Sequence, residues 1–474
     1  MTVFFNQILP NIVGDISNAL YTYILIIALI LCGLYFTIRS RFAQFRLFKH
    51  QIKSVTQKAS DGKGTSSFQA LMVSTASRVG TGNIIGVATA ICLGGFGSVF
   101  WMWVIAIIGG ASALIESTLA QIYKRKGTDG WHGGPAYYIE TALKSRSLAI
   151  VFSIFLILTY AFGFNMLASY NLQSTFSAYS FYNPEITPWI IGLITAVLVG
   201  YCLFGGGKRI AKVASFIVPI MGAIYILVAL LVVILNIETL PGVFKAIFSG
   251  AFDFEAIFGG FTGSCIMYGI KRGLYSNEAG VGSAPNASAT AEVDHPIQQG
   301  LVQILSVFID TILVCTATAF MCMCSGVEPA TSSAGAADYV QRAISATLGG
   351  FGPVFITVAM IFFAFTTLIG NLYYVDQSLF FMFKKKPSKV FLSVYYIIAS
   401  LVIFVGAGLN AGLLWDIADI TMGLMALINV PVILILGKYA LRALRDYEGK
   451  IKRGEKMSFK ASDVGITENL DAWK

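Results

Sequence analysis

The sequence contains little charge and few potential metal ligands. Only 12% of its 474 residues are Asp, Glu, Lys or Arg, whereas charged residues make up about 25% of soluble domains. The three histidines (His50, His132 and His295) are far apart and show no metal-ligand spacing. Neither an H-E-x-x-H motif nor a G-x-S-x-G nucleophile elbow is present. These absences argue against a soluble fold and against a membrane enzyme, so we predict that the protein is not an enzyme.

Apolar residues are abundant instead. Hydrophobic residues make up 56% of the chain, and the mean hydropathy is +0.74. The apolar runs are continuous and about 20 residues long, which is the length of a transmembrane helix, whereas the strands of a membrane β-barrel alternate over short segments. The seven cysteines fall mostly within these runs, where we expect them to act as small packing residues. The expected fold class is therefore an all-α polytopic membrane protein.

The apolar runs predict about eleven transmembrane helices. They lie near residues 16–38, 68–93, 98–123, 147–175, 187–205, 211–236, 257–275, 297–325, 350–382, 390–408 and 411–437.

Lysine and arginine gather in every second connection between these spans. The basic segments are 39–63, 124–126, 208–212, 271–272 and 384–389, together with the C-terminal tail. Because basic loops stay on the cytoplasmic side, the pattern predicts a multi-pass protein of the cell membrane with its N-terminus outside and its C-terminus in the cytoplasm. These loops also explain the net charge of +9, so we expect the lipid bilayer, and not nucleic acid, as a partner.

Spans two and seven are rich in glycine, which is a poor residue for an uninterrupted helix. Close helix packing would explain isolated glycines. These two spans, however, each begin a set of five transmembrane spans. Because five is an odd number, the second set starts from the opposite side of the membrane. Interrupted helices in matching positions of inverted repeats are typical of secondary transporters. The glycines are Gly80, Gly82 and Gly86 in span two, and Gly259, Gly260, Gly263, Gly269 and Gly273 in span seven.

The predicted organisation is thus a 5+5 inverted repeat. Residues 1–40 form one extra N-terminal transmembrane helix, 66–236 the first five-helix repeat, 254–437 the second, and 438–474 a cytoplasmic tail.

Charged residues inside the spans are expected to be functional or paired, because an isolated charge is costly in the bilayer. Arg78 lies in the interrupted span two, and we predict either a structural ion pair with Glu116 or Asp310 or a role in holding an anionic substrate group. Glu278 follows span seven and is either part of an inner gate or a solvated loop charge.

Three segments resemble motifs of the alanine or glycine:cation symporter family, the sodium:alanine symporters. They are "GTGNIIGVATAI" (80–91), "GGFGSVFWMWVIAIIG" (94–109) and "RGLYSNEAGVGSAPNASATAEVDHPIQQG" (272–300). The resemblance implies a leucine-transporter-like fold and sodium-coupled import of small neutral amino acids, alanine or glycine, by alternating access. It implies sodium as the coupling ion and no cofactor.

The same resemblance implies roles for individual residues. The substrate would lie at the first interruption, where the amides of Thr81 and Gly82 would meet its carboxylate. Sodium would bind to backbone carbonyls and to a hydroxyl pair in span nine. The implied substrate-binding residues are Gly80, Thr81, Gly82, Asn83, Asn165, Phe261, Thr262, Ser264, Cys265 and Met267, and the implied sodium ligands are Ala76, Val79, Phe363, Thr366 and Thr367.

Several alternatives stay open. Threonines such as Thr366 and Thr367 often bond only to their own helix. Ala168 stands where the family commonly has Gln, which leaves room for a larger neutral substrate such as glutamine. A proton-coupled amino-acid transporter is the alternative within the class of transporters, although the Arg78 cation does not titrate at useful pH. An ion channel is the alternative from another class of membrane protein.

Overall fold

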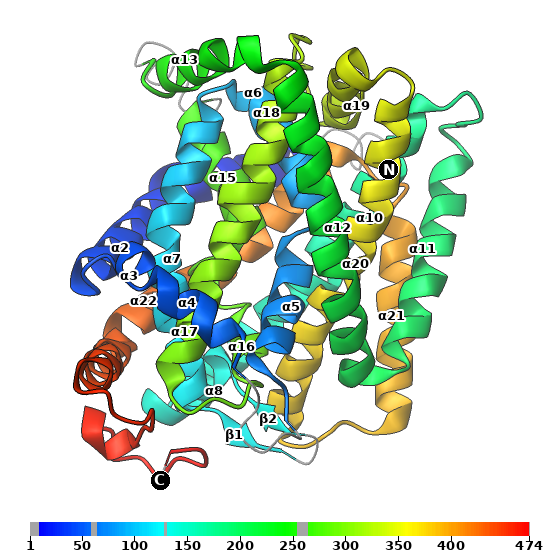
Figure 1. Ribbon diagram of the computed structural model, residues 1–474. Coiled ribbons are helices and arrows are strands. Elements are labelled where there is room, and N and C mark those ends of the chain that lie inside the picture. The colour runs from blue at the N-terminus through cyan, green and yellow to red at the C-terminus, as the bar shows by residue number, and fades with distance from the viewer. Residues whose placement is uncertain (1–8, 58–63, 128–129, 254–263, 474) are drawn as a thin grey trace.

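The computed structural model describes residues 9–57, 64–127, 130–253 and 264–473, and it is built almost wholly of helices (Figure 1). Eight described helices are long and apolar enough to cross a membrane. They are Leu9–Arg39 (α1 Leu9–Leu20, η2 Tyr21–Leu25 and α2 Ile26–Arg39), α7 (Ser98–Ile122), Arg146–Ala178 (α9 Arg146–Ile157, η4 Leu158–Gly163, α10 Phe164–Ser174 and η5 Thr175–Ala178), α12 (Gly206–Leu235), Pro296–Cys324 (α17 Pro296–Val307, η8 Phe308–Cys315 and α18 Thr316–Cys324), α20 (Phe351–Phe383), α21 (Lys389–Gly406) and α22 (Ala411–Arg453).

A ninth span is bent. It joins α5 (Ser67–Arg78) to η3 (Gly82–Gly86) and α6 (Val87–Gly94) with a bend of 50°. The predicted number of eleven is not confirmed, because α11 (Thr187–Leu203) is apolar but only 17 residues long and the seventh span is described only from residue 264 onward.

Many large apolar side chains are exposed on the surface, whereas several charged side chains are buried in the interior. Large apolar side chains such as Leu193, Leu227 and Leu401 are more than half exposed, while Glu278 and Asp310 are fully buried. An apolar exterior around a polar interior suits a protein that is solvated by lipid.

The first interruption begins where α5 ends. A capping box between Ser66 and Gln69 starts this helix, with Ser66 Oγ accepting from the Gln69 amide at 3.2 Å. The helix stops after Arg78 because Val79 adopts an extended conformation, with φ −76° and ψ 91°. A new helix then starts at Gly82, which leaves two half-helices that meet at residues 79–81.

The second interruption follows α15 (Cys265–Asn277). Glu278 closes that helix in the left-handed region, with φ 53°, and Gly280 and Gly282 also have positive φ values. The short helix α16 (Pro285–Ser288) continues on the other side. In Figure 1, α15 lies above α16 whereas α5 lies below α6, so the two interrupted helices run in opposite directions, as an inverted repeat requires.

Two of the glycines expected in the second interruption, Gly269 and Gly273, do not interrupt their helix, and Gly259, Gly260 and Gly263 lie outside the described residues. The described chain from Cys265 to Asn277 is one helix, although it includes Gly269 and Gly273. Those two glycines serve close packing, because an added Cβ at Gly269 would lie 2.5 Å from the Ser98 carbonyl oxygen of α7, and one at Gly273 would lie 2.6 Å from Ile105. The interruption in the described residues is at 278–284.

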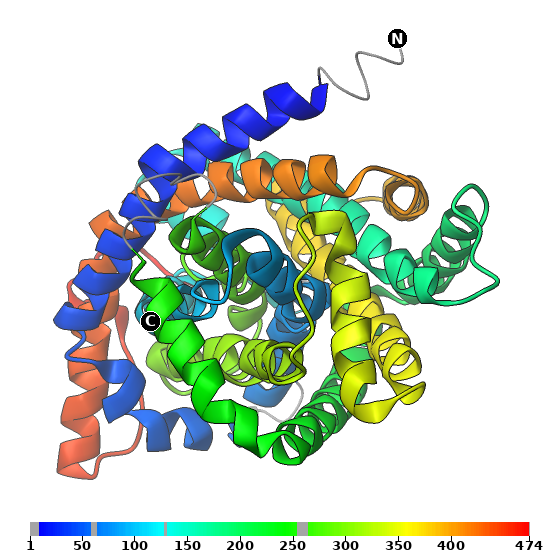
Figure 2. The same cartoon turned by 90° about the horizontal axis from the view of Figure 1, so that it is seen from above.

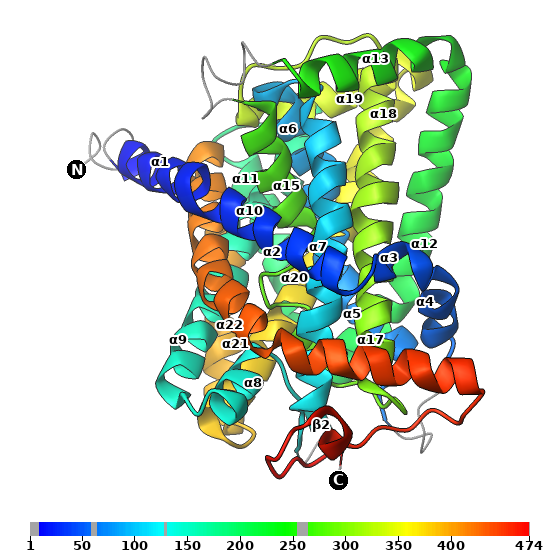
Figure 3. The same ribbon diagram turned by 90° about the vertical axis from the view of Figure 1, so that its left-hand side faces the viewer.

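The remaining elements cover the two ends and the sides of the bundle. From above, α1 and α2 run along the outside, whereas α6 and α15 lie in the interior (Figure 2). The last part of α22 turns across the lower end (Figure 3), so the boundary predicted at residue 437 falls within a helix. The other elements are α3 (Ala43–Arg46), α4 (Phe48–Val55), the antiparallel pair β1 (Arg125–Lys126) and β2 (Trp131–His132), α8 (Pro135–Ala142), η6 (Ile237–Thr239), α13 (Leu240–Ala251), η9 (Ser333–Gly335), α19 (Ala336–Leu348) and η10 (Ala461–Val464).

Candidate substrate and sodium site

The two interruptions lie side by side in the middle of the bundle. Ser77, in the last turn of α5, has its hydroxyl 2.9 Å from Oε1 of Glu278. On the other side of the first interruption, the Asn83 side-chain amide donates to Ser276 Oγ at 3.1 Å. The chain therefore brings together four helix ends, each with backbone groups that its own helix cannot satisfy.

A new helix N-terminus forms at Thr81 and Gly82. The amide of Gly80 is already satisfied, since it donates to Asn83 Oδ1 at 2.7 Å. The following amides open the helix, and such a terminus favours a carboxylate through its free N–H groups and its dipole. The hydroxyl of Thr81 accepts from Asn171 Nδ2 at 3.4 Å, which connects this terminus to α10.

Helices α10 and α20 form the neighbouring wall. Asn371 of α20 donates to Asn165 Oδ1 of α10 at 2.9 Å, and its Oδ1 lies 2.7 Å from the Ser77 hydroxyl. Within the described residues, Asn165 Nδ2 and Asn171 Oδ1 have no hydrogen-bond partner although both side chains are fully buried. Buried polar atoms without partners are costly, so these two amides are suited to a polar ligand.

The threonine pair of α20 divides into two different environments. The Thr366 hydroxyl donates within its own helix, where the carbonyl oxygens of Phe362 and Phe363 lie at 2.9 and 3.1 Å. The Thr367 hydroxyl, in contrast, is buried without a partner in the described part of the chain and faces Gly80. Helix α20 approaches α5 closely there, because an added Cβ at Gly370 would lie 2.7 Å from the Ser77 amide nitrogen.

A second group of oxygens surrounds Asp310 of η8, which is fully buried. Its Oδ2 accepts from the hydroxyls of Ser276 and Thr311, both at 2.7 Å. Its Oδ1 accepts from Asn83 Nδ2, also at 2.7 Å. A carboxylate with hydroxyl neighbours offers the hard oxygen ligands that a small cation prefers.

Arg78 does not form the ion pair that the sequence suggested. Its Nη1 donates to Gln303 Oε1 at 2.9 Å, and its Nε and Nη2 have no partner among the described residues, although the side chain is 2% exposed. Glu116 binds elsewhere, since it accepts from the Gly280 amide at 3.3 Å and from Asn429 Nδ2 at 2.9 Å. Arg78 is therefore held by a neutral amide, and Glu116 secures the second interruption.

An aromatic layer from α15, α10 and α22 covers the site. The Tyr275 ring packs against Gly82, where an added Cβ would lie 2.7 Å from it. The rings of Phe164 and Trp415 contact it with centroids 4.5 and 4.9 Å away. Three residues earlier on α15, Arg272 lies 3.9 Å above the Trp415 ring.

A buried ion cluster lies beyond this layer. Arg272 Nη2 donates to Asp419 Oδ2 at 2.5 Å, and Lys271 Nζ lies 3.6 Å from the same oxygen. Both cations are 2% exposed. Interpreting residues 271–272 as cytoplasmic loop charges was therefore wrong, because they are paired inside the bundle.

The structure does not bring all predicted substrate residues to the interruptions. Ser264 caps the start of α15, and Cys265 donates to the Gly250 carbonyl at 3.4 Å. Met267 contacts Thr22 of the extra helix. This end of α15 is about 18 Å from Asn277 at the usual helical rise. Phe261 and Thr262 lie outside the described residues.

Other residues take their place around the site. Tyr275 and Ser276 come from the end of α15, Asn171 from α10 and Asn371 from α20. The motif "YSN" directly before Glu278 could have indicated these site residues in the sequence, since it is polar and precedes two closely spaced glycines.

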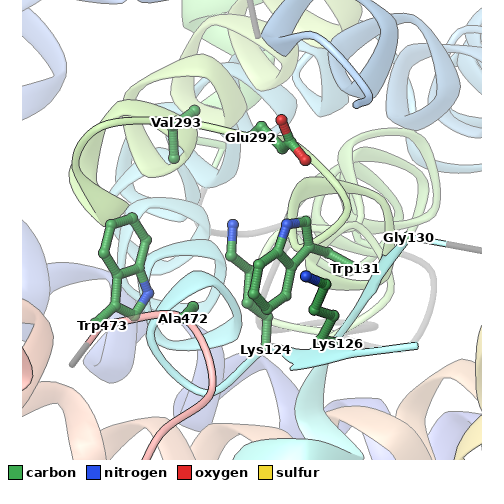
Figure 4. A pocket seen from close by; sticks show the side chains of 8 residues that line it. All are labelled: Lys124, Lys126, Gly130, Trp131, Glu292, Val293, Ala472 and Trp473. Atoms are coloured by element: carbon green, nitrogen blue, oxygen red, sulfur yellow. The ribbon is translucent and has the colours of Figure 1, made fainter. Parts of the chain in front are cut away.

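A separate cavity of about 320 Å³ lies at the lower end, next to the C-terminal segment (Figure 4). Lys124 lies over the rings of Trp131 and Trp473, and burial lowers its pKa to about 7. Trp473 Nε1 donates to the Gln121 carbonyl at 2.7 Å, which fixes the end of the chain to the end of α7. None of these residues lies at the interruptions.

Comparisons with known proteins agree with this geometry. Residues 6–461 match the Sodium:alanine symporter family. The amino-acid carrier protein AlsT of Bacillus subtilis (strain 168) is 43% identical over 474 residues, which cover 100% of this chain and 99% of that protein. The probable sodium/glutamine symporter GlnT of the same organism is 41% identical over 98% of this chain and 96% of that one.

One solved structure has the same arrangement of helices. The structure of MhsT in complex with L-phenylalanine has a TM-score of 0.52 and 15% identity, and the match covers 86% of this chain and 92% of that chain. At that identity the likeness shows the fold alone, which is the predicted leucine-transporter-like fold.

Proposed function

Because the chain belongs to the sodium:alanine symporter family, we propose that it imports a small neutral amino acid together with sodium, by alternating access around the two interruptions. The family consists of symporters, so the chain is a multi-pass membrane transporter and not an enzyme. The meeting of two interrupted helices that run in opposite directions is the observation that carries the proposal.

The substrate carboxylate binds at the helix N-terminus formed by Thr81 and Gly82. This assignment rests on the position of these amides at the start of η3 and on the satisfied Gly80 amide next to them. Asn165 and Asn171 provide the nearby polar wall, because each has an amide atom without a partner in the described residues. Tyr275 covers the site from the side of α15.

One sodium ion binds between α5 and α20. The Thr367 hydroxyl is the oxygen best suited to it, since it is buried, unpartnered in the described chain and directed at Gly80. The carbonyls of Ala76, Val79 and Phe363 complete the set that the resemblance implied. Thr366 contributes less in this arrangement because its hydroxyl bonds to its own helix.

A second sodium ion binds at Asp310. Asn83, Ser276 and Thr311 surround this carboxylate at hydrogen-bonding distance, and they come from both interrupted helices and from η8. Because two of these residues flank the substrate site, binding of sodium here would also stabilise the arrangement that holds the substrate.

The substrate is alanine or glycine, and glutamine is the second candidate. The family description favours alanine, whereas a relative that is 41% identical carries glutamine in its name. The chain is oriented with the basic segments at 39–57 and 384–389 toward the cytoplasm, so that α13 and α19 face outward.

Uptake into proteoliposomes tests the function. Labelled alanine, glycine and glutamine are offered separately, with an inward sodium gradient, with an inward proton gradient, or with neither. We expect accumulation of at least one amino acid that requires the sodium gradient. Uptake that ignores sodium and follows the proton gradient would contradict sodium coupling, and a conductance without accumulation would favour a channel.

A further inference from the structure

The helices α3 and α4 have an inverted distribution of polar and apolar side chains. They follow a sharp turn at Arg41 and Phe42, which both have positive φ values of 55° and 56°. Gln44 and Gln51 are buried, and Gln51 donates to the Gln44 carbonyl at 2.7 Å. Phe45, in contrast, is 60% exposed. An outward phenylalanine above inward glutamines is typical of a helix whose outer face is in lipid.

An apolar groove of about 300 Å³ lies between these helices and the bundle. Figure 3 shows α3 and α4 beside α7 and α17, which supply the other two walls. Its walls include Phe45, Phe48, Ile107, Gly110, Ile304 and Ile312, and Gln44 and Gln51 are the two polar side chains among the lining residues. Apart from these two glutamines, the lining offers few of the two to four polar partners that a water molecule needs. A flexible hydrocarbon chain needs none.

The segment that contains α3 and α4 is strongly basic. The segment 39–55 contains five lysines and arginines and no acidic residue. Arg46 is engaged by Glu448 of α22 at 2.7 Å, whereas Lys49 and Lys53 are exposed. These two lysines are four residues apart on α4 and therefore share one face of that helix, next to the face of Phe48.

We propose that this groove binds one acyl chain of an anionic phospholipid, whose head group is held by Lys49 and Lys53. The apolar walls fit the chain, the exposed lysines fit the anionic head group, and the position at the edge of a membrane-embedded bundle gives a lipid direct access. A peptide occupant is less suited, since the walls offer its backbone few polar partners.

Native mass spectrometry of the purified full-length protein tests the proposal, with phosphatidylglycerol and phosphatidylcholine as the two probes. Gly110→Leu projects a side chain into the groove, and Gly110→Ala is its control, because an added Cβ would lie at ordinary contact distances of 3.4 Å from Gln44 and 3.6 Å from Ile304. We expect Gly110→Ala to retain bound phosphatidylglycerol and Gly110→Leu to lose most of it. Ile107→Trp narrows the groove from the same helix if Gly110→Leu does not fold.

The head-group part of the proposal has its own variant. Lys49→Gln with Lys53→Gln should lower the preference for phosphatidylglycerol over phosphatidylcholine by about 25-fold, or about fivefold for each cation near an anionic head group. Lys384→Gln with Lys385→Gln, at another basic connection, should leave the preference unchanged. A folded Gly110→Leu protein that binds as much phosphatidylglycerol as Gly110→Ala would overturn the proposal that the groove holds the acyl chain. An equal preference for phosphatidylglycerol over phosphatidylcholine in the two double lysine variants would overturn the head-group site at Lys49 and Lys53.

Discussion

Gly80 in the first interruption lies directly against the hydroxyl of Thr367 on α20. A methyl group at position 80 would overlap that oxygen, so the glycine is needed for the close approach of two helices and not only for the bend. Thr367 has no other partner in the described residues. The contact thus connects the interruption that we assign to the substrate with the hydroxyl that we assign to sodium.

Gly80→Ala should therefore lower sodium-driven uptake by about tenfold or more, since an overpacked core costs about 1–3 kcal/mol. Gly86→Ala is the matched control on the same interrupted helix, because its added Cβ would lie 3.4 Å from Trp415, an ordinary contact. The measurement is labelled alanine uptake into proteoliposomes at equal amounts of folded protein. Equal losses in both variants would show that the approach to Thr367 is not special.

Thr367→Ala should raise the sodium concentration for half-maximal uptake by about tenfold, since a bond to a charged group is worth about 1.5–3 kcal/mol. Thr366→Ala should have a smaller effect, because its hydroxyl is already bonded to the Phe362 and Phe363 carbonyls. Sodium titrations of uptake compare the two variants. The assignment fails if the Thr366 variant needs more sodium than the Thr367 variant.

Asp310→Asn preserves the shape of the side chain but removes its charge. If a second sodium ion binds there, we expect fewer sodium ions to enter for each amino acid, together with weaker sodium dependence. Asp376→Asn is the control, since Asp376 is also a buried aspartate but bonds to Tyr396 on α21. Parallel fluxes of radioactive sodium and alanine give the ratio. An unchanged ratio in Asp310→Asn would mean that this carboxylate only holds the helices together.

The nine spans found in the described residues and the first interruption were predictable from the sequence because they depend on local properties. Hydropathy follows directly from side-chain chemistry, and the glycines around Thr81 stand next to a polar asparagine. Gly269 and Gly273 were wrongly assigned to the second interruption, because glycine has the same appearance in a sequence whether it permits a break or a close approach. They serve the close approach to α7, whereas the break in the described residues lies at 278–284.

Long-range pairing was the other information that the sequence could not supply. Lys271 and Arg272 resemble loop charges until Asp419, 147 residues further on, is placed beside Arg272. Arg78 shows the opposite case. The predicted acidic partner is replaced by the neutral Gln303, and no local pattern distinguishes an amide from a carboxylate as the partner of an arginine.

Asp419→Asn should destabilise the protein more than Arg272→Gln. The first change removes the carboxylate that forms salt bridges with both buried cations, whereas the second leaves Asp419 with Lys271 at 3.6 Å. Removing one partner of a buried pair costs about 3–5 kcal/mol, so the midpoint of thermal unfolding in detergent should fall clearly for Asp419→Asn. A larger fall for Arg272→Gln would show that Lys271 does not compensate.

His295, which caps the start of α17, should make stability depend on pH. Its Nδ1 accepts from the Ile297 amide at 3.2 Å, so the proton is on Nε2, which donates to Asp446 at 3.1 Å. Burial lowers the pKa of His295 to about 4. As the pH falls from 6.5 toward 4, the unfolded chain therefore binds a proton that the folded protein refuses, and stability decreases.

His295→Asn should remove this part of the pH dependence while it keeps the helix cap, since asparagine is also a good capping residue. Between about pH 6.5 and pH 5, the free energy of unfolding of the wild-type protein should fall more steeply than that of the variant, by up to about 1.4 kcal/mol per pH unit. The midpoint of thermal unfolding should fall more steeply in the wild-type protein as well. Above pH 7 the two profiles should run parallel, because the imidazole is then neutral in both the folded and the unfolded chain. Parallel profiles over the whole range would mean that His295 takes up its proton in the folded protein as readily as in the unfolded chain.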